Sequence, residues 1–350
     1  MRLTFKEYDA VRLGVLSAVA VLLLAQAPGS AQQPTSWRDP SPHRVHFVTV
    51  EEDIRLEVLD WGGSGQPLVL LAGLGNTAHV FDEFAPKLTD TYHVYGITRR
   101  GYGSSSRPES GYTATRLSED VLAVLDALKL TRPVLAGHSF GGEELTILGM
   151  RHSGRIAGLV YMDAAADRTP TAPATTDPRI QEFRKKFPAP QGLPKMTEAD
   201  LASFPAAQAY WKKWAVGVTL PEAEIRQMFQ TTADGRVGGY RTPGSVGQAC
   251  RAGVEKPDFA RIRVPVLSFV VIPGIDDCLR SLQREDDDAR AACIEVTAVS
   301  RRLREERFKA FQSSVPQARV ITMPMAKHYV FISNEEEVLR EMRAFLARLT

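Results

Sequence analysis

Ser139 lies within a G-x-S-x-G pattern at residues 137–141, and this is the part of the sequence best suited to chemistry. Glycine on both sides permits a sharp turn from a strand into a helix, where backbone segments approach too closely for larger side chains. Such a turn lifts the serine hydroxyl clear of the sheet. It also brings the backbone N–H of Phe140 beside an oxygen that becomes negative during acyl transfer. The pattern therefore predicts that Ser139 is a nucleophile and that Phe140 is an oxyanion donor.

The residues on either side of this pattern support the same interpretation. Residues 132–136 form a short apolar run typical of a buried strand, and residues 142–151 are typical of a helix. Glu143 and Glu144 lie in the first turn of that helix, where the helix dipole favours acids. An ordinary glycine-rich turn is the alternative, but the surrounding strand and helix are the context that the motif requires.

A serine hydroxyl needs a base to take its proton, and the base needs a third group to orient it. The chain has seven histidines, and we predict that His328 is the base because it follows the last expected strand. Catalytic groups gather at the carboxyl ends of parallel strands. His138 occupies the variable position of the turn and is expected to point away from the reacting face of the serine.

Three aspartates are candidates for the orienting acid. Asp277 is the first choice, because it follows the expected strand at 264–272 and preserves the chain order serine, acid, histidine. Asp276 lies in the same turn, and Asp163 ends the expected strand at 156–162, so both remain alternatives. Each of the three is also a residue type that caps turns and helices.

The loop at residues 72–76 follows an expected buried strand and is a second source of oxyanion donors. The backbone N–H of Leu74 is best placed there to pair with that of Phe140. Loss of one such donor typically costs ~100- to 1,000-fold in rate.

Strand and helix patterns alternate along most of the chain and predict a mostly parallel α/β sheet. A hairpin is expected from the runs 43–50 and 54–59. Further strands are expected at 67–72, 92–98, 132–136, 156–162, 264–272 and 318–323, and helices at 80–88, 117–130, 142–151 and 335–349.

Two segments depart from this alternation. Residues 167–262 carry short helical stretches and several aromatic residues, and we expect them to form a cap in which most aromatics pack onto the core. Residues 276–307 are dense in charge and predict a solvated helical surface. Their clustered acids lack the interleaved glycines and fixed spacing of a calcium loop, so no metal site is expected there.

The N-terminal segment resembles a secretory signal. Basic residues precede an apolar run at 13–25, and small residues end at Ala31. This run is shorter than the ~20 apolar residues that a spanning helix needs, so cleavage after Ala31 is favoured over a retained membrane anchor. Export permits a disulfide, and we predict that Cys278 pairs with Cys293 and that Cys250 has no cysteine partner. Three free thiols are the alternative.

Residues 43–350 resemble the α/β-hydrolase superfamily. The match rests on residues 70–74, 99–105, 137–142, the strand from Pro265 to Gly274 and Asp277, and residues 327–329. The resemblance implies an eight-stranded, mainly parallel sheet with helices on both faces and a helical cap after strand six. The expected organisation is a signal peptide at 1–31, a linker at 32–42, core at 43–166 and 263–350, and a cap at 167–262.

This chain departs from the family pattern in two places. The oxyanion loop begins Ala72-Gly73 where the family often has His-Gly, which leaves the backbone donor intact. An unusually long stretch with two cysteines separates Asp277 from the last strand, so Asp276 and Asp163 stay open as alternatives for the acid.

The predicted function is an exported, secreted or periplasmic serine hydrolase that cleaves a carboxylic ester of a small molecule. Related epoxide hydrolases and haloalkane dehalogenases use an aspartate at the position of Ser139, so their chemistry is not expected. C–C bond or amide hydrolysis and perhydrolase or haloperoxidase-like activity remain alternatives, as does ligand binding without catalysis on the same scaffold. No cofactor or metal is called for, and the net charge of +2 gives no reason to expect nucleic acid as a partner. The oligomeric state stays open.

Overall fold

The computed structural model describes residues 37–172, 176–188, 190, 192–272, 274–284 and 286–349. The predicted signal peptide at 1–31 and residues 32–36 of the predicted linker therefore lie outside the described residues. The chain from Pro40 onward forms one compact unit. Within the described residues, no helix combines the length and the apolar character needed to cross a membrane.

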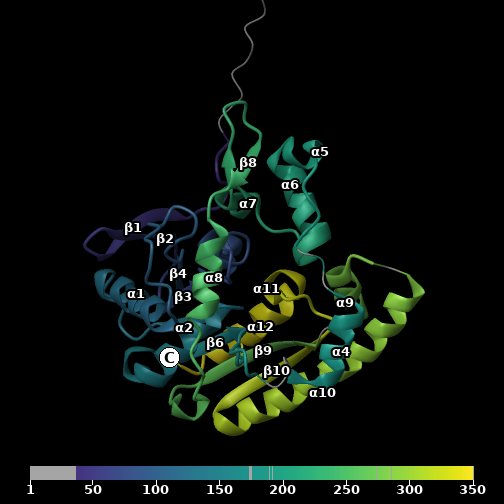
Figure 1. Ribbon diagram of the computed structural model, residues 1–350. Helices are drawn as coiled ribbons and strands as arrows, with labels where there is room; N and C mark the ends of the chain where they lie inside the picture. Colours follow the sequence, from purple (N-terminus) through teal and green to yellow (C-terminus); the bar gives the residue numbers. More distant parts are fainter. Residues whose placement is uncertain are drawn as a thin grey trace, which may run out of the picture. The chain divides into compact units, whose positions relative to one another are not determined.

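An eight-stranded sheet runs through this unit, in the order β1-β2-β4-β3-β5-β6-β9-β10 (Figure 1). Its strands are β1 Arg44–Glu51, β2 Ile54–Gly62, β3 Pro67–Leu71, β4 His93–Ile97, β5 Val134–His138, β6 Gly158–Met162, β9 Val266–Ile272 and β10 Ala318–Pro324. Strand β2 pairs antiparallel with β1 and with β4, and every other neighbouring pair in the sheet is parallel. The predicted hairpin and the predicted eight-stranded, mostly parallel sheet are confirmed.

The central strands are apolar throughout because both faces of the sheet are covered. Every residue of β5, β6 and β9 is buried. Side chains alternate between the faces, so Leu68 and Leu70 of β3 join one apolar cluster and Val69 and Leu71 join another. Helix α12 (Glu335–Leu346) packs into the first cluster. Helices α1 (Ala114–Ala127) and α2 (Gly141–Arg151) pack into the second.

Some expected helices have different boundaries in the structure, and for two of them the cause is local. The expected helix at 80–88 is two short 3₁₀ helices, Ala78–Phe81 and Ala85–Leu88. Pro86 explains the break, because proline lacks the N–H that a continuing helix needs and is tolerated only in a first turn. Helix α1 begins three residues earlier than expected, because the side chain of Thr113 accepts a hydrogen bond from the Arg116 N–H and caps the helix.

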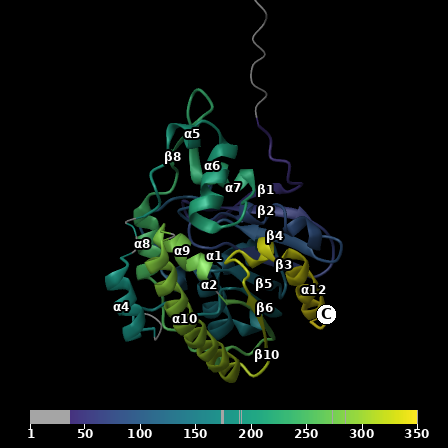
Figure 2. The same ribbon diagram turned by 90° about the vertical axis from the view of Figure 1, so that its right-hand side faces the viewer.

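The chain between β6 and β9 carries several short helices and a small hairpin. They are α4 Pro178–Lys186, α5 Glu198–Leu201, α6 Phe204–Trp211, a π-helical turn Lys212–Val216, α7 Glu222–Met228, β7 Phe229–Thr231, β8 Val237–Tyr240 and α8 Gly244–Ala252. Helices α5, α6 and α7 and strand β8 form one group at the top of both views (Figures 1 and 2). Phe204 and Phe229 are buried in the same apolar cluster as β3 and β9, as expected for most aromatics of this segment.

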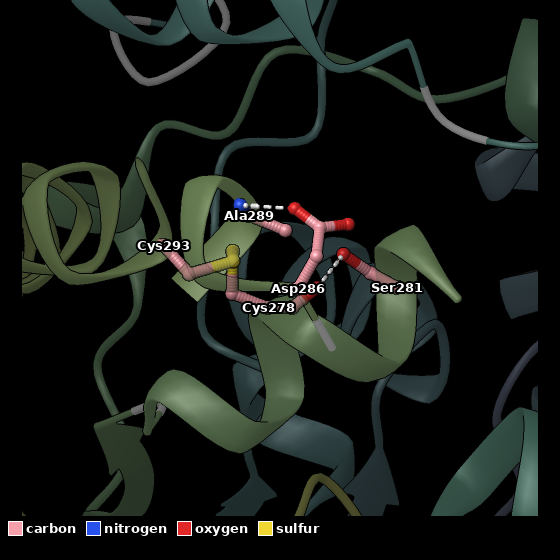
Figure 3. The surroundings of a disulfide bond; sticks show 5 residues. All are labelled: Cys278, Ser281, Asp286, Ala289 and Cys293. Atoms are coloured by element: carbon pink, nitrogen blue, oxygen red, sulfur yellow. Dashed lines mark hydrogen bonds between the residues drawn. A yellow bond between two sulfur atoms is a disulfide. The ribbon is translucent and has the colours of Figure 1, made fainter. Parts of the chain in front are cut away.

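The charged segment after β9 forms two helices, α9 (Ile275–Leu282) and the long α10 (Asp287–Ser314). A disulfide between Cys278 and Cys293 joins them, which confirms the predicted pair (Figure 3). Cys250 is free and buried. Asp286 caps α10 by accepting a hydrogen bond from the Ala289 N–H at 2.9 Å. The helical part of the prediction for residues 276–307 therefore holds, although the inner face of α10 is not solvated.

Breaking this disulfide is expected to lower stability. The bond closes a short loop, with a sequence separation of 15 residues between its cysteines. In the chain-entropy model, a loop of that size contributes about 3 kcal/mol. The double variant Cys278→Ser/Cys293→Ser should therefore melt at a lower temperature than the parent under non-reducing conditions. With a reducing agent present the two proteins should melt at similar temperatures, and a persistent difference would contradict this account.

Candidate active site

Ser139 occupies a strained turn directly after β5. Its φ of 51° lies in the left-handed region, which is uncommon for a residue other than glycine. Its backbone N–H donates to Met162 O at 3.2 Å, and its carbonyl accepts from the Gly142 N–H at 3.0 Å. This is the strand–turn–helix geometry expected of the motif, and strain of this kind is concentrated at functional sites.

The glycines of the turn are required by close contacts. A Cβ added at Gly137 would lie 2.8 Å from Gly141 O, and one at Gly141 would lie 2.6 Å from Leu71 O. A Cβ at Gly142 would lie 2.3 Å from Ala164 O. Larger residues at these positions would force the turn away from β3 and from the end of β6.

The loop at residues 72–76 lies directly against this turn. A Cβ added at Gly73 would lie 3.2 Å from the Ser139 Cβ, so even alanine there would push the loop and the turn apart by a few tenths of an ångström. The Asn76 N–H donates to Gly73 O at 3.2 Å and closes the loop. Gly73 of this loop therefore lies beside the serine, and Leu74 packs in one apolar cluster with Phe140. The role of the Leu74 N–H as an oxyanion donor stays a prediction. Within the described residues, no backbone acceptor is recorded for the N–H of Leu74 or of Phe140.

His328 is oriented by Asp163. The imidazole Nδ1 lies 2.6 Å from Asp163 Oδ2, and the side chain of His328 is 46% exposed whereas that of Asp163 is 4% exposed. Asp163 follows β6 directly and also has a positive φ, 50°. Its other oxygen, Oδ1, accepts from the Val271 N–H at 3.1 Å and from Arg304 Nη2 at 2.6 Å. These three donors fix both carboxylate oxygens.

The surroundings of Asp163 keep it ionised. Burial by itself would raise the pKa of this carboxyl, but the positive charge of Arg304 and the hydrogen bonds from His328 and Val271 outweigh burial and lower the pKa to about 2. A carboxylate in this state orients an imidazole and stabilises the imidazolium that forms when the imidazole takes a proton.

The first choice of acid, Asp277, is wrong as a partner of His328. Its carboxylate caps α9 by accepting from the Gly274 N–H at 3.2 Å, and it pairs with Arg280 at 3.1 Å and with Lys327 at 3.0 Å. The chain enters a helix so soon after β9 that Asp277 is the third residue of α9. Asp276 is exposed on the same turn. Asp163, one of the two alternatives, is the carboxylate that lies beside His328.

A cavity of about 650 Å³ opens beside Ser139, Asp163 and His328, and all three line it. Ala215 and Val216 line it from the π-helical turn between α6 and α7. Within the described residues, Ser139 Oγ has no recorded hydrogen bond to His328, and such bonds are often long until substrate is bound.

Four arginines also line the cavity, and sequence reasoning did not single them out: Arg168, Arg280, Arg304 and Arg307. The signal available in the sequence was the spacing of Arg304 and Arg307, because residues three apart lie on one face of a helix.

His138 is buried behind the site. Its Nε2 lies 3.1 Å from the backbone carbonyl of His328, and its ring centroid lies 4.6 Å from that of His328. Burial, followed by the proximity of His328, lowers the pKa of His138 well below its usual value, so the ring is neutral. A neutral imidazole that donates from Nε2 holds the loop carrying His328.

A buried network joins the loop at residues 72–76 to the loop of His328. Glu224 of α7 accepts from Asn76 Nδ2 at 2.9 Å, and also from the N–H and the hydroxyl of Thr77. The hydroxyl of Tyr329 donates to Asn76 Oδ1 at 2.9 Å. Burial raises the pKa of Glu224 to about 7, although the hydrogen bonds from Thr77 and Asn76 oppose the shift.

This raised pKa predicts a stability that falls with rising pH. A carboxyl with a folded pKa of about 7 and an ordinary value of 4.5 binds its proton more tightly in the folded state. Its contribution is therefore greatest below pH 4.5 and is lost as pH rises to about 7, by at most about 3 kcal/mol. Glu224→Gln should reduce the loss in free energy of unfolding between pH 5 and pH 8, measured by urea denaturation. Glu222→Gln on the same helix is the matched control, and an unchanged slope in Glu224→Gln would refute this assignment.

Residues 68–341 match the model of the Alpha/beta hydrolase family, and the chain belongs to this family. Epoxide hydrolase A of Mycobacterium tuberculosis is 29% identical over 216 residues, which cover 61% of this chain and 60% of that protein. A putative non-heme haloperoxidase of Mycobacterium phage D29 is 34% identical over 105 residues, 30% of this chain and 38% of that protein. The chain thus spans less than two thirds of the length of these relatives.

Solved structures show the same fold. The crystal structure of E-2-(acetamidomethylene)succinate hydrolase has a TM-score of 0.62 at 18% identity and covers 87% of this chain and 99% of that one. A malate-bound thermophilic esterase from Thermogutta terrifontis has a TM-score of 0.56 at 18% identity, with the same 87% and 99% coverage.

Proposed function

We propose that this chain is a serine hydrolase that cleaves a carboxylic ester through an acyl-enzyme on Ser139. The observation that carries the proposal is the hydrogen bond between His328 Nδ1 and the buried Asp163 at the edge of the cavity that Ser139 also lines. Ser139, Asp163 and His328 come from separate segments of the chain and line one cavity, which supports their roles as nucleophile, orienting acid and base.

The arrangement supports a two-step reaction. His328 accepts the proton of Ser139 as its oxygen attacks the ester carbonyl, and the N–H groups of Leu74 and Phe140 stabilise the oxyanion. His328 then donates the proton to the leaving alcohol. Water, activated by the same imidazole, releases the acid from Ser139. Asp163 keeps His328 in the required tautomer throughout.

The same groups also suit other reactions. C–C bond cleavage, amide hydrolysis and perhydrolysis use the same serine attack. Perhydrolysis is retained as an alternative because one relative is named a putative non-heme haloperoxidase. An epoxide hydrolase is also among them, but Ser139 replaces the carboxylate that an alkyl-enzyme ester requires. A role in binding alone is disfavoured, because a base and an orienting acid, His328 and Asp163, both line the cavity that Ser139 lines.

We further propose that the protein is exported and that its segment 167–262 caps the site. The signal-like pattern at 1–31 and the disulfide between Cys278 and Cys293 support export, since disulfides persist in oxidising compartments. Ala215 and Val216, which line the cavity, support the cap. N-terminal sequencing of the protein expressed from the full chain should find Gln32 first. An intact N-terminus in the membrane fraction would favour a retained anchor.

Labelling with a fluorophosphonate probe tests the mechanism. The probe should modify Ser139, as mapped by peptide mass spectrometry, and Ser139→Ala and His328→Ala should each abolish labelling. A panel of esters of graded acyl length should then show turnover. Absence of both labelling and ester turnover in the folded protein would overturn the proposal.

A further inference from the structure

The charged side chains of the cavity are mostly neutralised in pairs. Arg304 pairs with Asp163 at 2.6 Å, Arg280 pairs with Asp277 at 3.1 Å, and Arg168 pairs with Glu143 at 2.9 Å. Asp277 also forms an ion pair with Lys327 at 3.0 Å, so two cations share this one carboxylate.

Arg307 is different from the other three arginines. Within the part of the chain that the structure describes, no ion pair to Arg307 is recorded, and its buried Nε has no hydrogen-bond partner. Asp167, the remaining carboxylate of the cavity, accepts hydrogen bonds at Oδ1 from the N–H and the hydroxyl of Thr169. The described lining thus contains four arginines but three aspartates, Asp163, Asp167 and Asp277, so its positive charge is in excess.

The electrostatics of Arg307 point in the same direction. Burial lowers the pKa of its guanidinium, and the neighbouring charge of Arg304 lowers it further, while Asp167 opposes the shift. A half-buried cation beside a second cation is stabilised most by an anion that contacts both.

Arg307 is also well placed to bind such an anion. Arg304 and Arg307 lie three residues apart on α10, so both side chains leave the same face of the helix, and both line the cavity that Ser139 and His328 line. The planar fork of an arginine matches a carboxylate in a bidentate manner. Much of the remaining lining is apolar, with Ala164, Ala165, Val216, Val270 and Phe308.

We propose that Arg307, assisted by Arg304, binds a carboxylate of the substrate, so that the preferred substrate is a monoester of a small dicarboxylic acid. This inference rests on the proposed ester hydrolase function. Arg307 contributes its free guanidinium, whereas Arg304 keeps its contact with Asp163 and adds charge. The apolar walls then hold the short carbon chain between the bound carboxylate and the ester carbonyl. A cavity of about 650 Å³ is of the size that holds small molecules.

A matched pair of substrates tests this inference. Monoethyl succinate carries a carboxylate where ethyl 4-methylpentanoate carries an isopropyl group of similar shape. The wild-type protein should hydrolyse the succinate monoester with a higher kcat/KM, measured by released ethanol. Arg307→Gln should lower kcat/KM for the monoester by roughly 10- to 100-fold, mainly by raising KM. It should change kcat/KM for the neutral ester by no more than about threefold. Arg307→Lys should recover part of the loss.

Arg302→Gln is the control, because it removes the same charge from an exposed position on α10, where Arg302 pairs with Glu306. Arg302→Gln should change kcat/KM for neither ester by more than about twofold. Thermal melts of all variants should show that each is folded.

A second measurement separates this inference from the proposed function. Ser139→Ala should bind monoethyl succinate in isothermal titration calorimetry, and Ser139→Ala/Arg307→Gln should bind it at least ten times more weakly. Equal effects of Arg307→Gln on both esters, or no effect on either, would overturn the anionic substrate while leaving a labelled, ester-cleaving enzyme in place. Absence of both fluorophosphonate labelling and ester turnover in the wild type would instead overturn the function on which the inference rests.

Discussion

Replacing Ser139 by alanine is expected to reduce ester hydrolysis by roughly 10⁴- to 10⁶-fold in kcat. The hydroxyl is the only group of the turn that can form the acyl-enzyme, and its strained position after β5 holds it above the sheet. Residual turnover should come only from the oxyanion donors and substrate binding. Initial rates with the best ester of the panel measure the effect.

The alanine variant should fold normally, because Ser139 Oγ makes no recorded hydrogen bond within the described residues and the backbone of the turn is unchanged. Circular dichroism and thermal melting provide this control. A folded Ser139→Ala protein that retained more than about one hundredth of the wild-type rate would exclude an acyl-enzyme at this residue.

Replacing Asp163 by asparagine is expected to reduce kcat by about 10³- to 10⁴-fold. The amide cannot accept from His328 Nδ1 as a carboxylate does, and it leaves Arg304 without its counter-charge. The variant should therefore also be less stable than the parent, by roughly 3–5 kcal/mol as for other broken buried pairs. Kinetics are to be measured well below its melting temperature.

Asp277→Asn is the matched comparison for the acid. Asp277 caps α9 and pairs with Arg280 and Lys327, so its loss should lower kcat less than about tenfold. The two variants together decide between Asp277, the first choice from the sequence, and Asp163, the acid seen beside His328. A larger loss of kcat in Asp277→Asn than in Asp163→Asn would make Asp277, and not Asp163, the orienting acid.

The features that local sequence predicts well are those with local physical causes. The turn around Ser139 depends on glycines that must avoid Leu71, Gly141 and Ala164, and these requirements are visible in the pentapeptide itself. The parallel strands are visible for a similar reason, since β5, β6 and β9 are buried on both faces and must be apolar throughout.

The acid was misjudged because its choice is not local. Asp163 and Asp277 both follow strands that end at the same edge of the sheet, and chain order alone favours neither. The difference arises because the chain turns into α9 directly after β9, which commits Asp277 to capping that helix. Asp163 stays at the end of β6, where Val271 of β9 and Arg304 of α10 complete its contacts.

The sequence by itself determined the family fold, the nucleophile candidate Ser139, the base candidate His328 and the disulfide pair. The turn and the strands follow from short-range steric and periodic requirements, His328 from its place after the last strand, and the disulfide from two cysteines close in the chain. The tertiary structure alone decided the partner of His328, the arginines on the inner face of α10 and the buried Glu224 beside Asn76. Those contacts join residues more than 100 positions apart, and such contacts form only when packing brings separate helices and strands to one cavity.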